Sequence, residues 1–266
     1  MIAATMKNGT DINGEHPLIQ RFRNFATLSA EEEAGLRRLV DGPARTVAAR
    51  RDLIREGEAP RGVQLILSGW AGAYRMLEDG RRQGLAFLLP GDLSDVHNVV
   101  LNEMDHSIGA LTEVRYVELP HSRFEELVRV HPRLLHALRW QSMTAISVQR
   151  EWTVSIGQRS AFERLCHIFC EIFLRLKAVG LCADGSCDMP ATQADLAEAT
   201  GLTSIHVNRM VQDMREAGLI VLKNRRLAIP DFAALQRSAL FSPNYLHLGH
   251  SGSASPLGGY ANSQAN

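Results

Sequence analysis

One segment near residue 209 combines a helical apolar pattern with polar residues suited to reading DNA bases. Its apolar positions recur every three or four residues, and they are Val207, Met210, Val211 and Met214. Arg209 and Asn208 fall on the opposite face, where arginine can bond bidentately to guanine and asparagine to adenine. The residues expected to contact double-stranded DNA from this helix and its N-cap are Thr203, Ser204, Ile205, His206, Asn208, Arg209 and Gln212.

A short basic turn follows this helix. Lys223, Arg225 and Arg226 lie between two apolar runs, residues 219–222 and 227–229. Cations on such a turn suit backbone phosphates, which position a protein on DNA without reading its sequence. We therefore expect phosphate contacts from all three residues.

A second helix and a tight turn must hold the base-reading helix. Thr192 followed by Asp195 is a capping pattern, and Leu196 and Ala199 give that helix an inner face. Gly201 then permits the positive φ of a tight turn. With the two apolar runs around the basic turn, this predicts a helix-turn-helix with a two-stranded wing. Two short helices that only pack together are the alternative.

The residues from 53 to 119 have a β texture. Short apolar runs alternate with turn signals such as Asp79-Gly80 and Pro90-Gly91-Asp92, which is typical of an antiparallel roll or sandwich. Further helices are expected at either side: one starts after Ser29, which can act as its N-cap, and another spans Ala161 to Leu176.

A long helix is expected after His131-Pro132, because proline is tolerated in the first turn of a helix and poorly inside one. Its apolar positions are Leu138, Ala145, Val148, Trp152 and Ile156. Such a helix is too long for one small roll to cover, so we expect part of this stripe to face a second copy of the chain. A helix buried within one domain is the alternative, and Gly157 is a candidate hinge.

These segments predict an α+β protein with an N-terminal antiparallel β-roll, a long dimerisation helix and a C-terminal winged helix-turn-helix. The expected division is a flexible N-terminus (1–17), the roll (18–130), the dimerisation helix (131–157), the DNA-binding domain (158–232) and a disordered tail (233–266). The tail is assigned because its last 25 residues are rich in Ser, Gly and Asn.

Charge and length exclude several classes of protein. The 266 residues contain 29 Lys or Arg and 29 Asp or Glu, so the formal net charge is zero and a bulk polyelectrolyte binder is excluded. Residues 190–230 hold five basic and four acidic residues, which leaves discrimination to particular side chains. There is no secretory signal or long apolar run, so we expect a cytoplasmic protein with no membrane contact.

Taken in order, several motifs resemble the Crp/Fnr family of bacterial transcription regulators. They are Glu56-Gly57-Glu58, Leu65-Ile66-Leu67-Ser68-Gly69, Asp79-Gly80-Arg81, Leu89-Pro90-Gly91-Asp92, the long helix after His131-Pro132, and residues 192–220. The resemblance implies an eight-stranded sensor roll of the cyclic-nucleotide-binding type and a homodimer on a palindromic operator. It also implies a guanine contact from Arg209 in each half-site, and RNA polymerase as a partner if the protein is an activator.

Two departures limit what the resemblance implies about cofactors. Asp95-Val96 replaces the Gly-Glu pair that holds the ribose in nucleotide-binding members, and His106 replaces the phosphate-binding arginine. The candidate effector pocket therefore contains Asp95, Val96, His97, His106 and Ser107, and cyclic AMP is disfavoured. Because no cysteine precedes position 166, the usual N-terminal iron–sulfur cluster is also disfavoured. No cofactor is expected, and the effector is unknown.

Four cysteines lie close together in sequence. Cys166 and Cys170 share a helix face, whereas Cys182 and Cys187 fall in an expected loop. Four thiols could hold a metal and two could form a redox switch, but the spacing is not a paired C-x-x-C. We expect inert thiols and no metal site, and solvated rather than ligating roles for His97 and His106.

No nucleophile elbow, phosphate-binding glycine loop or convergent carboxylate pair is present, so no enzymatic activity is expected. The sequence predicts a DNA-binding regulator controlled by an effector or by its own abundance. Ile205 stands where many Crp/Fnr members have glutamate, so their operator sequences do not transfer to this chain. A thiol- or metal-responsive regulator and a dimeric interaction scaffold that does not bind DNA are the alternatives.

Overall fold

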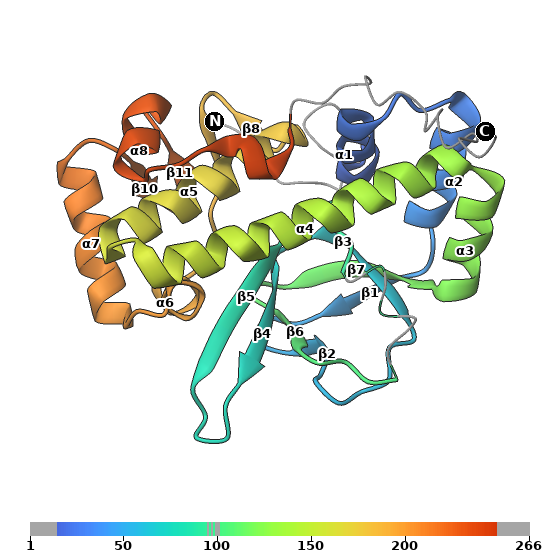
Figure 1. Cartoon of the computed structure of the whole chain (residues 1–266), viewed down its shortest axis with the longest axis horizontal. Coiled ribbons are helices and arrows are strands. Elements are labelled where there is room, and N and C mark those ends of the chain that lie inside the picture. The colour runs from blue at the N-terminus through green and yellow to red at the C-terminus, as the bar shows by residue number, and fades with distance from the viewer. Residues whose placement is uncertain (1–14, 95, 97, 99–101, 249–266) are drawn as a thin grey trace, which may run out of the picture.

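The computed structural model describes residues 15–94, 96, 98 and 102–248, and two antiparallel sheets form its N-terminal half (Figure 1). The sheets have the strand orders β1-β7-β3 and β2-β6-β4-β5. Their strands are β1 Ala44–Val47, β2 Asp52–Ile54, β3 Gly62–Ser68, β4 Ala71–Met76, β5 Arg82–Leu88, β6 Ser107–Ala110 and β7 Val114–Pro120. These seven strands of the described residues, with an isolated bridge between Leu65 and Leu93, form the expected antiparallel roll.

Strand β3 is buried on both faces. Its side chains point alternately to the two faces and so belong to two different hydrophobic cores. Val63 and Leu65 point toward the helices, whereas Ile66 packs between the two sheets. Gly69 ends the strand with a φ of +78°, and a Cβ there would lie 2.0 Å from the carbonyl oxygen of Glu113. This turn therefore requires glycine.

Two helices cover one side of the roll before β1. They are α1 Pro17–Phe25 and α2 Ala30–Val40, and α2 begins with the expected cap, in which Ser29 and Glu32 form a reciprocal capping box. The N-terminal segment was expected to be flexible up to residue 17, but this is wrong for its last residues, His16 and Pro17. His16 is buried and caps α1 through its side chain, which accepts from the Leu18 amide, so this helix start is fixed by burial and capping. Residues 1–14 lie outside the described part.

Helix α3 His121–Val130 leads into α4 Pro132–Gln158, which runs across the whole molecule (Figure 1). At 27 residues α4 is about 40 Å long, and it continues through Gly157, so no break occurs at the candidate hinge. The expected apolar stripe divides. Leu138, Val148 and Trp152 are buried within the chain, whereas Ala145 and Ile156 are exposed. No helix in the described ranges is both long enough and apolar enough to cross a membrane.

The C-terminal half is a helical domain with a small sheet. Its elements are α5 Ala161–Ala178, β8 Cys182–Ala183, β9 Ser186–Asp188, α6 Gln193–Thr200, α7 Ser204–Glu216, β10 Val221–Lys223, β11 Arg226–Ala228 and α8 Phe232–Ser238. The sheet order is β10-β11-β9-β8. The expected two-stranded wing is therefore part of a four-stranded sheet, and the segment of Cys182 and Cys187, expected as a loop, is a hairpin. A two-residue turn at Asp184-Gly185 lets these strands pair.

The chain was also expected to be disordered from residue 233, and this is wrong for most of residues 233–248. Helix α8 continues to Ser238, and a short 3₁₀ helix, η2, spans Pro243–Leu246. Leu235, Phe241 and Leu246 are buried against the helical domain, so a few apolar anchors order a segment whose average composition is polar. Residues 249–266 lie outside the described part.

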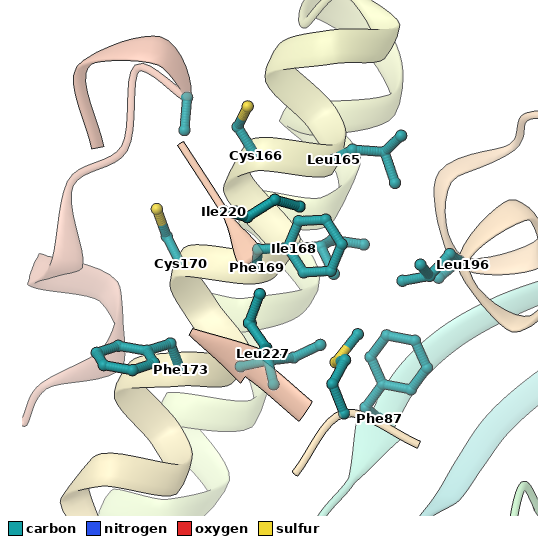
Figure 2. Packing of buried hydrophobic residues seen from close by; sticks show 14 of the residues in the cluster. Phe87, Leu165, Cys166, Ile168, Phe169, Cys170, Phe173, Leu196, Ile220 and Leu227 are labelled. Atoms are coloured by element: carbon teal, nitrogen blue, oxygen red, sulfur yellow. The ribbon is translucent and has the colours of Figure 1, made fainter. Parts of the chain in front are cut away.

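The roll and the helical domain share a core. Phe87 of β5 reaches the cluster around Phe169 of α5 (Figure 2). Its ring centroid lies 6.0 Å from that of Trp70 and 5.7 Å from that of Trp152 on α4. The roll is therefore packed directly against the domain that carries the helix-turn-helix.

Candidate nucleic-acid interface

Local capping fixes both helices of the helix-turn-helix. Thr192 and Asp195 form a capping box at the start of α6, and Gly201 ends that helix with a φ of +66°. Thr203 caps α7 by accepting from the His206 amide at 3.2 Å. Each of these features was predicted from local sequence, because caps depend on residues only a few positions apart.

The two faces of α7 divide as predicted. Its inner residues are buried and its outer residues are exposed: the inner set is Val207, Met210, Val211 and Met214, and the outer set is Ser204, Ile205, Asn208, Arg209 and Gln212. Ile205 is 84% exposed, and His206 lies half-buried at the margin. The buried inner face thus anchors α7, and the outer face exposes one arginine and two amide side chains, Arg209, Asn208 and Gln212.

A contact between the two helices orients one of those amides. The Oδ1 atom of Asn208 accepts from Nε2 of Gln193 on α6 at 2.9 Å. This bond uses one of the two lone pairs of the oxygen, so the oxygen and the NH₂ group of Asn208 can both still bind a base edge. Gln193 was missed by sequence reasoning, although its place in the first turn of α6 is the signal that could have identified it.

The wing turn separates its three cations into two kinds. Asn224 and Arg225 have φ values of +52° and +58°, as in a tight hairpin turn, and Lys223 and Arg225 are exposed. Arg226 instead pairs with Asp188 at 2.9 Å and donates to Oγ of Ser186 at 2.7 Å, both on β9. Arg226 therefore binds the wing to the neighbouring strand, a role that the linear sequence did not indicate.

The roll contacts α6 through charged side chains that sequence reasoning also missed. The guanidinium of Arg50 contacts the two oxygens of Asp195 at 2.5 and 3.2 Å. Arg82 pairs with Glu198 at 3.0 Å, and the Gln83 amide donates to the Glu198 carbonyl at 2.8 Å. The hydrogen bond to Asp195 raises the pKa of Arg50, and burial raises the pKa of Glu198. The first helix of the DNA motif is thus held by the roll.

Two residues of the candidate effector pocket, His106 and Ser107, are bound by neighbouring groups. Nδ1 of His106 is bound by the Asp105 carboxylate at 2.6 Å, which holds the pKa of Asp105 below its usual value. The Ser107 hydroxyl already accepts from the Glu56 amide at 2.9 Å. Both side chains are therefore already engaged within the chain. Val96 is half-buried, and Asp95 and His97 lie outside the described residues.

The interior beside this pocket is occupied by the chain's own side chains. The Tyr74 hydroxyl donates to Asp52 at 2.8 Å, and the Arg82 guanidinium lies 3.5 Å from the centre of the Tyr74 ring. A small pocket remains between roll, α4 and α6, and Tyr74, Phe87 and Trp152 are among its lining residues.

The four cysteines form two different environments. Cys166 and Cys170 are fully buried on the same side of α5 (Figure 2), and burial raises the pKa of Cys166 to about 12. Cys182 and Cys187 are opposite each other in the β8–β9 hairpin. Across the described part of the chain, no group of three or more His, Cys, Asp or Glu side chains could hold a metal ion.

Family models match both halves of the chain. A model described as a cyclic nucleotide-binding domain covers residues 44–131, and one described as a Crp-like helix-turn-helix domain covers residues 163–238. The two matches coincide with the roll and with the helical domain that contains α6, α7 and the wing.

Curated relatives agree with these matches. The nitrogen fixation regulation protein FixK of Bradyrhizobium diazoefficiens is 30% identical over 179 residues, which cover 65% of this chain and 72% of the relative. The transcriptional activator protein FnrL of Cereibacter sphaeroides is 27% identical over 199 residues, which cover 73% of this chain and 79% of the relative.

Solved structures support the fold. FixK2 from Bradyrhizobium japonicum superposes with a TM-score of 0.66 at 20% identity, over 73% of this chain and 96% of that one. The CRP-family regulator TTHB099 from Thermus thermophilus gives 0.58 at 22% identity, over 74% and 97%. Together with the exposed outer face of α7, these matches identify the chain as a DNA-binding transcription regulator that belongs to the Crp/Fnr family.

Proposed function

We propose that this regulator binds a palindromic operator as a homodimer and places one α7 in the major groove of each half-site. The observation that carries the proposal is the division of α7 into a fully buried inner face and an exposed outer face with Asn208 and Arg209. A helix anchored on one side and polar on the other fits the major groove, where the edges of the bases can be read.

The exposed side chains have distinct proposed roles. Arg209 and Asn208 bind base edges, and Ile205 contacts a thymine methyl group, a role open to an apolar side chain in the groove. Thr203, Ser204, His206 and Gln212 add polar contacts around them. Lys223 and Arg225 bind phosphates, whereas the ion pair between Arg226 and Asp188 supports a positioning role for Arg226.

Helix α4 supports the proposed dimer. Met143, Ile146 and Val154 are exposed apolar residues, and at 100° per residue they lie on one face of the helix. Helices that pair along such a face bury these side chains and fix the separation of the two α7 helices. An operator with half-sites one DNA turn apart, about 34 Å, matches this arrangement.

Control of the proposed dimer does not rest on a cyclic nucleotide, because His106 is bound to Asp105 and supplies no arginine-like fork. We propose control by another effector or by abundance, and a cytoplasmic protein without catalytic activity. FnrL, a relative named as a transcriptional activator, supports activation as the outcome, with RNA polymerase as the further partner.

The test is a hydroxyl-radical footprint on the DNA upstream of the protein's own gene, combined with sedimentation of the complex. We expect two protected patches whose centres lie about one helical turn apart, and a complex that contains two chains. The paired change Met143→Glu and Ile146→Glu should give single chains with weak, unpaired protection. Wild-type protein that leaves the DNA unprotected at low salt would support the interaction-scaffold alternative instead.

A further inference from the structure

We infer that Cys182 and Cys187 form a reversible dithiol–disulfide site in the β8–β9 hairpin, for which a peroxide is the oxidant. The site lies apart from the exposed face of α7 and from the candidate effector pocket. Four observations carry the inference: the strand register, the difference in accessibility between the two thiols, the nearby positive charges, and the contrast with the other two cysteines.

The register places the two cysteines directly opposite each other. Asp184 and Gly185 form a two-residue turn with φ values of +50° and +69°, and Ala183 pairs with Ser186 beside that turn. Cys182 and Cys187 are the next pair along the ladder. After a two-residue turn this pair is the one without mutual backbone hydrogen bonds, in which Cα atoms lie about 4.5 Å apart. Disulfides accept Cα separations of about 4.4 to 6.8 Å, so the bond needs side-chain rotation and little backbone movement.

The two thiols differ in accessibility, which assigns their order of reaction. Cys182 is half-buried, whereas Cys187 is fully buried behind it. The Cys182 thiol lies 3.6 Å from the Phe173 carbonyl, to which it can donate. A hydrogen bond with Cys187 and the positive charges of Lys177 and Arg226 lower the pKa of Cys182. Because the thiolate is the reactive form, Cys182 is the attacking thiol and Cys187 the resolving one.

The proposed oxidation balances with one peroxide per disulfide. The Cys182 thiolate attacks one peroxide oxygen and the O–O bond breaks. Cys182 becomes a sulfenic acid, and the other oxygen leaves as water or an alcohol after taking a proton. The Cys187 sulfur then attacks the sulfenic sulfur, and the hydroxide that it displaces leaves as water with the Cys187 proton. The two thiols lose two electrons to the peroxide, and a reducing dithiol restores them by thiol–disulfide exchange.

Cys166 and Cys170 provide a control within the same chain. Both are fully buried on α5 among Leu165, Ile168 and Phe169 (Figure 2). Burial raises the pKa of both thiols, that of Cys166 to about 12. Neither thiolate formation nor access to peroxide is therefore favourable at these two positions, and we expect them to stay reduced when the hairpin pair reacts.

Strand β9, which contains Cys187, pairs with strand β11 of the wing. Cys187 is opposite Leu227 of β11, the Met189 amide donates to the Arg225 carbonyl at 2.7 Å, and Asp188 pairs with Arg226. A cross-link between β8 and β9 restricts opening of this sheet. Oxidation should therefore slow amide exchange at Met189 and Leu227, and its effect on DNA rests on the proposed phosphate contacts of the wing.

The experiment treats the full-length protein with hydrogen peroxide, blocks remaining thiols under denaturing acidic conditions, and digests with trypsin. Peptide 178–209 contains Cys182 and Cys187, whereas peptide 165–175 contains Cys166 and Cys170. We expect oxidised peptide 178–209 to be about 2 Da lighter than the reduced, unblocked peptide, and its two cysteines not to react with the blocking reagent. Dithiothreitol should reverse both changes. Peptide 165–175 should stay fully blocked. Oxidised protein should also show slower exchange at Met189 and Leu227.

Two variants separate the roles of the thiols. Cys187→Ser should stop at a Cys182 sulfenic acid that dimedone traps, and Cys182→Ser should leave Cys187 reduced. A wild-type peptide 178–209 that stays reduced or proceeds to sulfinic acid, or equal oxidation of peptide 165–175, would overturn the inference. None of these masses depends on DNA binding. Failure of the cross-link therefore leaves the proposed function intact, whereas failure of the reduced protein to bind DNA leaves the cross-link intact.

Discussion

Both guanidinium NH₂ groups of Arg50 in the roll donate hydrogen bonds to the carboxylate of Asp195 on α6, at 2.5 and 3.2 Å. The same carboxylate accepts from the backbone amide and the hydroxyl of Thr192, so it caps α6 and anchors the roll at once. Asp195 is only 1% exposed, whereas Arg50 is 50% exposed. The Asp195 carboxylate therefore joins the roll to the first helix of the DNA motif, beside the contacts of Arg82 and Gln83 with Glu198.

Removing Arg50 should loosen this connection without breaking the helix cap. We expect Arg50→Ala to speed amide exchange at the start of α6 and to cost about 1 kcal/mol of unfolding free energy, since half of the ion pair is solvent-exposed. Hydrogen exchange and urea unfolding measure the two effects.

Arg81→Ala is the matched control, because Arg81 is exposed and its guanidinium pairs with Asp79 in its own turn. It should leave α6 exchange unchanged. Equal exchange at α6 in wild-type and Arg50→Ala protein would show that the ion pair does not hold the two parts together.

The segment after α8 should contribute to stability through its apolar anchors. Phe241 is buried against Phe232 and Tyr245, so Phe241→Ala should cost about 3 kcal/mol. The adjacent Leu240 is 68% exposed, and Leu240→Ala should change stability by less than about 0.5 kcal/mol. Thermal and urea unfolding of both variants measure these changes in unfolding free energy. Equally small changes for the two variants would show that the segment does not contribute to stability.

Acid should destabilise the protein through His167. Burial, with the positive charge of Arg159, lowers the pKa of His167 to about 3, from about 6.5 when unfolded. The unfolded chain therefore binds the proton first. The stabilisation is fully present above pH 6.5 and is lost as pH falls toward 3, by up to about 1.4 kcal/mol per pH unit.

His167→Gln should accordingly flatten the decline of unfolding free energy between pH 6 and pH 4.5, whatever its effect at pH 7. The neighbouring groups Glu151, Glu171 and Tyr245 remain in both proteins, and His16, whose pKa burial lowers to about 4, keeps its own share of the decline. Parallel pH profiles for the variant and the wild type would rule out the buried neutral histidine as a source of acid sensitivity.

The two neighbouring wing arginines should behave differently on DNA. Arg225 is exposed, so Arg225→Ala should weaken binding to all sequences and reduce the slope of log K against log salt by about 1. Arg226 pairs with Asp188, so Arg226→Ala should mainly speed amide exchange in β9 and β11. Salt titrations by fluorescence anisotropy test the difference, and interchangeable effects of the two changes would contradict it.

The sequence predicted the local features well because they depend on near neighbours. The cap at Thr203, the turn at Gly201 and the inner face of α7 follow from spacings of three or four residues. Contacts between distant segments left no such signal, and Arg50 and Asp195 are 145 positions apart. The roll was predicted as a class, but its contact with α6 was not.

Other errors had specific physical causes. The average composition after residue 233 concealed the anchors Leu235 and Phe241, because a few buried side chains outweigh many polar ones. The hairpin of Cys182 and Cys187 was expected as a loop, although Asp184-Gly185 is a strong two-residue turn signal. The contact of Arg226 with Asp188 depends on a strand pairing that no local pattern specifies.

Arg209 on α7 is proposed to read a base, and the ratio of operator affinity to non-specific affinity at fixed salt measures that role. Arg209→Ala should lower operator affinity by about 10-fold to 100-fold, as expected for loss of a bidentate guanine contact, and leave non-specific affinity nearly unchanged. Arg209→Ala protein that keeps the wild-type ratio would contradict the assignment of α7 as the base-reading helix.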